Sequence, residues 1–202
     1  MNRRLFLTTT LLAGITAATA IAQTTPPTRI RGTIASVSGN TMTVTARDGQ
    51  SLDILLNEPL TVLTVKKVEL STVGENAYVG IATRGDASGK PTALEVLVFP
   101  DSARGAGEGH YAWDLEPGSM MTNGTVTGVV TATSGRELSL KYKDGNQTIT
   151  VPPSTPIVTF APAERADLKP GAPVFLAATK NAEGKFTAGR VTVGKDGVAP
   201  PM

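Results

Sequence analysis

The chain has 202 residues, of which 19 are Lys or Arg and 17 are Asp or Glu, and it contains no cysteine. The lack of cysteine excludes disulfide bonds and a cysteine nucleophile. Arg3 and Arg4 are the only charged residues among the first 22, so residues 23–202 carry no formal net charge. A basic footprint for nucleic acid is therefore missing, and we do not expect a nucleic acid partner.

The N-terminus has the three parts of an export signal. Arg3 and Arg4 precede an apolar stretch that ends in the small-x-small cleavage site Ala20-Ile21-Ala22. We therefore expect a cleaved signal peptide over residues 1–22 and a periplasmic or secreted protein with no transmembrane segment in the mature chain; an uncleaved anchor is the alternative. Because residues 3–7 also resemble a twin-arginine signal, the general secretory and twin-arginine routes both stay open.

Residues 29–100 are predicted to form a first β-domain. Met42 and Val44 alternate with threonines, which places apolar side chains on one face of a strand. Turns at residues 38–40 and at Asp48-Gly49 separate three such strands into a meander. A short helical turn is expected within residues 66–74, and two more strands follow at 77–83 and 92–99.

The second half of the chain repeats this pattern. Residues 32–39 align with residues 128–135 at a shift of 96, and Asp48-Gly49 falls on Asp144-Gly145 at the same shift. The last strands match at a shift of 95 residues. We therefore predict an all-β protein of two tandem OB-like five-stranded small barrels, each with a short helical turn between its third and fourth strands. The second domain covers residues 124–194, after an unrepeated Gly-rich segment at 101–123, and 195–202 form a C-terminal tail.

A set of residues in the first copy also resembles a known family. The set comprises Gly32, Ile34, Val37, Gly39, Asp48-Gly49, Leu70, Gly74, Val79 and Ala93-Leu94-Glu95-Val96. It is similar to exported bacterial β-domains catalogued as a domain of unknown function, whose relatives are often labelled metal ABC transporter permeases. The resemblance implies a fold and a compartment. A permease needs several apolar spans, and beyond the signal peptide the sequence predicts none.

The unrepeated central segment, residues 101–123, holds the residues that the duplication does not explain. It contains the only His, the only Trp and two of the five Met residues of the chain. Our leading hypothesis is a non-enzymatic periplasmic binding or accessory protein with a protein or polysaccharide partner. The predicted binding surface consists of Arg104, Glu108, His110, Trp113 and Asp114.

The first alternative is a metal site in the central segment. His110 with Met120 and Met121 would suit copper, whereas His110 with carboxylates would suit zinc or manganese. A single His lacks the ligand spacing of zinc motifs, and adjacent methionines in a strand point to opposite faces. The segment is also interpreted as an ordered connector in which Trp113 fills an apolar seam and His110 makes a hydrogen bond.

No catalytic residue is assigned. Glu108 and Asp114 form the basis of a weaker alternative, a carboxylate-based hydrolase. Two carboxylates in a Gly-rich loop are more often simply solvated. Tyr142 between Lys141 and Lys143 is a weak basic and aromatic patch, which is better explained by a core tyrosine with two solvated neighbours.

Overall fold

The computed structural model describes residues 26–85, 89–132 and 135–200, so the predicted signal peptide lies outside the described residues. The first copy contains β1 (Thr28–Ser38), β2 (Thr41–Ala46), β3 (Ser51–Lys67), η1 (Leu70–Thr72), β4 (Tyr78–Gly85) and β5 (Pro91–Val98). The central segment adds η2 (Asp101–Ala103) and β6 (Gly109–Ala112). The second copy contains β7 (Met120–Ala132), β8 (Gly135–Tyr142), β9 (Gly145–Val151), β10 (Ile157–Pro162), η3 (Arg165–Asp167), β11 (Pro173–Lys180) and β12 (Phe186–Val193). The protein is all-β, as predicted, and the two short helical turns at η1 and η3 are confirmed.

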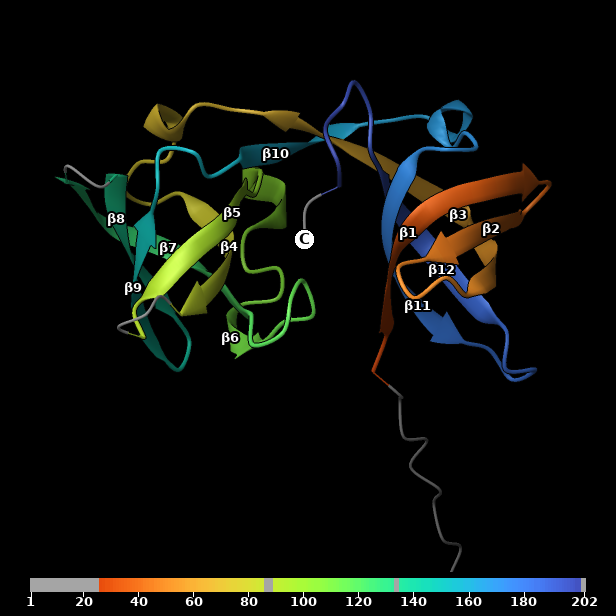
Figure 1. Cartoon of the computed structure of the whole chain (residues 1–202), viewed down its shortest axis with the longest axis horizontal. Helices are drawn as coiled ribbons and strands as arrows, with labels where there is room; N and C mark the ends of the chain where they lie inside the picture. Colours follow the sequence, from red (N-terminus) through yellow and green to blue (C-terminus); the bar gives the residue numbers. More distant parts are fainter. Residues whose placement is uncertain (1–25, 86–88, 133–134, 201–202) are drawn as a thin grey trace, which may run out of the picture.

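Five strands close into a barrel, which forms the lobe on the right of Figure 1. β1 pairs with β2, β2 with β3, β3 in parallel with β12, β12 with β11, and β11 with β1. Alternate residues along these strands point inward and fill the interior, which removes them from water and supplies most of the driving force for closure. The largest fully buried members are Ile34, Met42, Val44, Ile54, Leu56 and Leu176.

The remaining long strands form a second lobe with its own core. β4 pairs with β5 and with β7, β7 with β8, and β8 with β9, while β5 and β9 meet at Thr92 and Thr150. The buried side chains of this lobe include Val79, Ile81, Val96, Val126, Leu138, Leu140, Ile149 and Val151.

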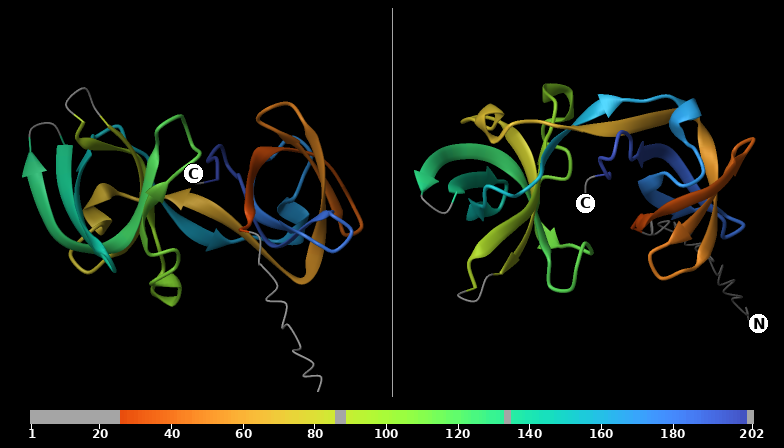
Figure 2. Two further views of the ribbon diagram at one scale, coloured as in Figure 1. Left: turned by 90° about the horizontal axis from the view of Figure 1, so that it is seen from below. Right: turned by 45° about the horizontal axis from the view of Figure 1, so that its top comes forward.

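This pairing corrects the predicted domains. The first three strands of each copy pair with the last two strands of the other copy, so neither 29–100 nor 124–194 closes on itself. The cause is visible in β3, which continues for 17 residues and carries the chain from one lobe to the other. Figures 1 and 2 show β3 and β10 crossing together between the lobes.

The two crossing strands also pair with each other. β10 runs antiparallel to the end of β3, with Val65 opposite Phe160. β10 continues in parallel beside β5, with Ile157 opposite Val96, just as Val62 of β3 lies opposite Val191 of β12. Equivalent residues of the two copies thus make equivalent contacts, and Val65 and Phe160, which are themselves equivalent, lie at a local two-fold axis.

The structure also corrects the alignment of the first strands. Ile34 pairs with Val44, and Val126 pairs with Leu140; each strand is irregular immediately after that pair. The structural equivalent of Gly32 is therefore Gly124, not Gly128 as the sequence alignment had it. The four-residue difference arises because the β7–β8 hairpin continues for two more pairs, to Ala132 and Gly135, than the β1–β2 hairpin.

Within the described residues, no helix has the length and apolar character that crossing a membrane requires.

Candidate functional site

The central segment is an ordered connector, fixed to the second lobe by strand pairing and by Asn123. β6 pairs with the start of β7. The Asn123 side-chain amide, Nδ2, donates to the carbonyl oxygens of Ala106 and Gly107 at 3.3 and 3.0 Å and to the Tyr111 hydroxyl at 3.2 Å. The Tyr78 hydroxyl donates to the same Ala106 oxygen at 3.1 Å, and burial raises the pKa of Tyr78 to about 12. Tyr78 therefore remains a hydrogen-bond donor at neutral pH.

The end of the connector contacts the closed barrel through Arg31. Because Ile30 points into the barrel, its neighbour Arg31 points outward, toward the connector. Its guanidinium lies 2.7 Å from Asp114 and its Cζ is 5.3 Å from the Trp113 ring and 4.6 Å from the Phe175 ring. The side chain is only 8% exposed, so the connector and the barrel bury a charged group between them.

Arg31 retains hydrogen-bonding capacity in this position. Nε and Nη2 are buried and have no partner among the described residues. Burial lowers the pKa of Arg31 below its ordinary value, and the opposing effect of Asp114 is smaller. Unpaired N–H groups of a buried cation are costly, although the flanking aromatic rings offset part of that cost.

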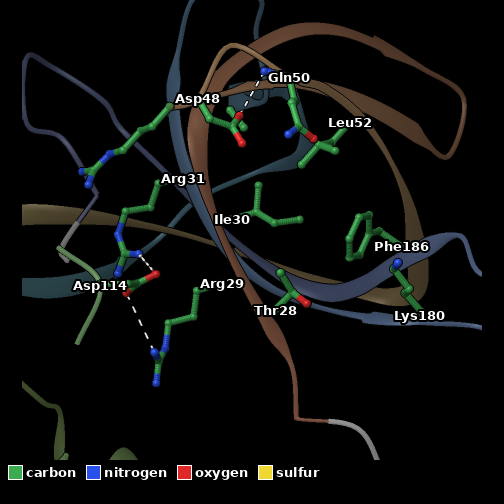
Figure 3. A pocket seen from close by; sticks show the side chains of 12 residues that line it. Thr28, Arg29, Ile30, Arg31, Asp48, Gln50, Leu52, Asp114, Lys180 and Phe186 are labelled. Carbon is green, nitrogen blue, oxygen red and sulfur yellow. Dashed lines mark hydrogen bonds and ion pairs between the residues drawn. The ribbon is translucent and has the colours of Figure 1, made fainter. Parts of the chain in front are cut away.

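Arg31 lies at the boundary of two clefts on the outside of the barrel. The first cleft, of about 500 Å³, is drawn in Figure 3. Arg29 and Arg31 reach Asp114 on one side of it, and Lys180 and Phe186 lie on the other. The second cleft, of about 510 Å³, shares Arg31, Ala46 and Arg47 with the first, so the two are adjacent.

Basic side chains predominate in the first cleft. Its charged lining residues are Arg29, Arg31, Arg47, Lys180, Asp48 and Asp114, four basic and two acidic. Hydroxyl and amide groups lie among them, from Thr28 and Gln50 in the first cleft and from Thr33 and Thr45 in the second. We call the two together the arginine cleft. It can pair with anions through guanidinium groups, whose planar N–H donors match carboxylate and phosphate oxygens.

The five residues of the predicted binding surface contact different parts of the protein. Trp113 and Asp114 reach the arginine cleft, where the Arg29 guanidinium lies 4.0 Å from the centre of the Trp113 ring. Arg104 instead donates to the Asn76 carbonyl oxygen and pairs with Asp101. The remaining two are His110, which stacks on Tyr142 in the second lobe, and Glu108, which is exposed before β6.

Sequence reasoning missed the arginines of β1 and the β2–β3 turn. The available signal was the alternation in Arg29-Ile30-Arg31, which places two cations on the outer face of a strand whose inner face is apolar. Their aromatic and acidic partners come from residues 113, 114 and 175, too far along the chain for the pattern to reveal them.

The proposed metal ligands are also divided. His110 pairs across the strands with Thr122, and its Nδ1 lies 2.9 Å from the Thr122 hydroxyl. Strand alternation puts Met120 on the same side as His110 and Met121 on the other, where it is buried among apolar residues. Met121 could therefore not be a ligand of an ion bound to His110. The described residues include no cluster of three or more His, Asp or Glu side chains with the geometry to hold a metal ion.

The two carboxylates of the hydrolase alternative lie at opposite ends of β6. A strand of four residues spans roughly 13 Å. The carboxyl groups of glycoside hydrolases are separated by about 5–10 Å. Moreover, Asp114 is already engaged by Arg31.

The Asp114–Arg31 pair should contribute measurably to stability. Asp114→Ala leaves a buried guanidinium without its counterion, and we expect it to lower the free energy of unfolding by about 1–2 kcal/mol, because Asp114 is partly solvated. Glu116→Ala is the matched control. It removes a partner of the exposed Arg84, 3.5 Å away, and should cost about 0–1 kcal/mol. Urea unfolding followed by Trp113 fluorescence would compare the two variants, and equal losses would contradict a special role for the buried pair.

Comparison of the chain with protein-family models, with curated proteins and with solved structures found no match. The family resemblance of the first copy therefore stays a prediction.

Proposed function

We propose that this chain is an exported, non-enzymatic binding protein that holds an acidic polysaccharide in the arginine cleft. The observation that carries the proposal is the buried guanidinium of Arg31, with two nitrogens that have no hydrogen-bond partner among the described residues, at the boundary of two adjacent clefts with a mainly basic lining. An anionic ligand would accept hydrogen bonds from the exposed Arg29 and Arg47 and would place negative charge close to a cation that the protein already holds out of water.

The scaffold of this proposal is a pair of interlocked OB-like barrels. The strand order of each copy, three strands, a short helical turn and two strands, is that of the OB-fold. We propose that the second lobe is also a barrel, closed through β5 and β9, and that each barrel borrows its last two strands from the other copy. OB-type barrels present loops and a strand face to oligosaccharides or oligonucleotides.

The mixed lining favours a sugar acid over other anions. Threonine hydroxyls and the Gln50 amide lie between the arginines, and a uronic acid offers hydroxyl groups and a carboxylate in each unit. Two adjacent clefts favour an extended chain over a single small anion. A nucleic acid ligand is not proposed, because single-strand binding normally combines a basic groove with exposed stacking rings, and Trp113 is already covered by Arg29.

The test is calorimetric titration of purified mature protein with alginate oligosaccharides, with neutral dextran oligosaccharides as the comparison ligand. We expect binding of alginate that weakens as salt is raised, and loss of binding in the variant Arg29→Ala/Arg47→Ala, in which both changes are at partly or fully exposed residues. Lys141→Ala, an exposed cation on the second lobe, is the matched control and should bind as the unchanged protein does.

Equal binding of dextran, or binding that survives the double substitution, would overturn the proposal. Poly-glutamate is titrated in parallel, and tighter binding of this acidic peptide would assign the cleft to a protein partner instead.

A further inference from the structure

A second cavity, distinct from the arginine cleft, lies between the two lobes. It has a volume of about 220 Å³ and no charged residue lines it. Four aromatic rings surround it: Phe99 follows β5, Trp113 follows β6, Phe160 is on β10 and Phe175 is on β11. Leu97 and Met121 complete the apolar wall. The exchange of strands thus builds this cavity from parts of both copies and of the connector.

Two buried polar atoms belong to residues that line this apolar cavity. Trp113 Nε1 can only donate a hydrogen bond, Asn123 Oδ1 can only accept one, and neither has a partner among the described residues. Asn123 is only 7% exposed. Buried polar atoms in native proteins are nearly always paired, so an unpaired donor and an unpaired acceptor beside one cavity indicate a missing partner.

The orientation of the Asn123 amide follows from its neighbours. Nδ2 faces the carbonyl oxygens of Ala106 and Gly107, which can only accept, so Oδ1 must be directed away from them. Oδ1 lies over Gly80, where a Cβ would approach it to 2.5 Å and the Phe99 ring to 3.0 Å. Oδ1 therefore packs directly on the Gly80 backbone, and it can take this position only because residue 80 has no side chain.

Water alone fits this site poorly. Each water occupies about 30 Å³ in the liquid and needs two to four polar partners, so a cavity of this size would hold several waters with only two protein groups to bind them. A dry cavity of about 150 Å³ lined by apolar side chains accepts benzene. A ring with one hydroxyl group matches both the volume and the polar atoms.

We propose that this cavity binds a small neutral phenol, with the ring among the aromatic side chains and the hydroxyl at the end near Trp113 and Asn123. A small side-chain adjustment on binding would let Trp113 Nε1–H donate to the hydroxyl and Asn123 Oδ1 accept from it. The ligand is uncharged because no ionic partner lines the cavity. This site shares Phe175 with the lining of the arginine cleft but does not require the proposed function.

The probe is 4-fluorophenol, whose fluorine NMR signal reports binding to the mature protein without using Trp113 as the reporter. We expect saturable binding of 4-fluorophenol and roughly 5- to 10-fold weaker binding of fluorobenzene, which lacks the hydroxyl. Trp113→Phe keeps an aromatic ring and removes the N–H donor, so it should reduce the difference between the two probes. Tyr142→Phe removes a hydroxyl outside the cavity and serves as the control with unchanged binding.

Gly80→Ala places a methyl group beside Asn123 Oδ1 and should abolish binding in folded protein, as judged by circular dichroism. If this variant does not fold, the Trp113→Phe comparison decides. The proposal is overturned by absence of saturable 4-fluorophenol binding, by equal affinity for fluorobenzene, or by binding that persists in folded Gly80→Ala protein.

Discussion

Residues 26–100 expressed alone should form a dimer. In the full chain, the first three strands of this copy close a barrel with β11 and β12, which a single copy does not contain. A second molecule can supply the equivalent strands β4 and β5, because equivalent residues of the two copies make equivalent contacts. The local two-fold axis between Val65 and Phe160 would become the true axis of a strand-exchanged dimer, with Val65 opposite its own counterpart.

Light scattering after gel filtration would measure the mass. We expect twice the mass of the single copy at micromolar concentration and dissociation coupled to unfolding on dilution, because each monomer lacks two strands of its barrel. Residues 119–200 should behave in the same way. A folded monomer at all concentrations would show that a copy can close on itself and would contradict the need for exchange.

Replacing Gly32 by alanine should be among the most destabilising single substitutions in this chain. A Cβ at this position would lie 2.1 Å from the carbonyl oxygen of Thr45 and 2.8 Å from its carbonyl carbon, so the backbones of β1 and β2 would have to separate. Gly124 has the equivalent contact, 2.6 Å from the Lys141 carbonyl oxygen. We expect Gly32→Ala to cost about 3 kcal/mol or more and Gly124→Ala somewhat less.

Two matched glycines make this prediction specific. A Cβ at residue 74 would have no atom within 4 Å, so Gly74→Ala should change the free energy of unfolding by less than about 0.5 kcal/mol. A Cβ at residue 128 would contact only the Ser139 side chain, at an ordinary distance of 3.7 Å, so Gly128→Ala should also be tolerated. If Gly128→Ala were as damaging as Gly32→Ala, in urea unfolding followed by Trp113 fluorescence, the structural equivalence of Gly32 and Gly124 would be wrong.

The candidate site was predictable only in part. The central segment was identified because it has no counterpart in the repeat, and two of its residues, Trp113 and Asp114, do reach the arginine cleft. Arg31 could not be assigned a role from the sequence, because its partners lie about 80 and 140 residues further along the chain. Asn123 has the same difficulty, since the position of its Oδ1 depends on a glycine in β4.

The sequence by itself determined the all-β class, the places of most strands and turns, and the duplication. These follow from local chemistry: alternation of apolar residues selects strands, and Asp-Gly selects tight turns. Only the tertiary structure decided which strands pair in each lobe. Inward-facing positions such as Val96 and Val191 are alike in the two copies, so pairing within a copy and pairing between copies bury the same kinds of side chain. The length of β3, which reaches from one lobe to the other, favours exchange of strands between the copies, and this exchange in turn brings Phe160 and Phe175 to the cavity between the lobes.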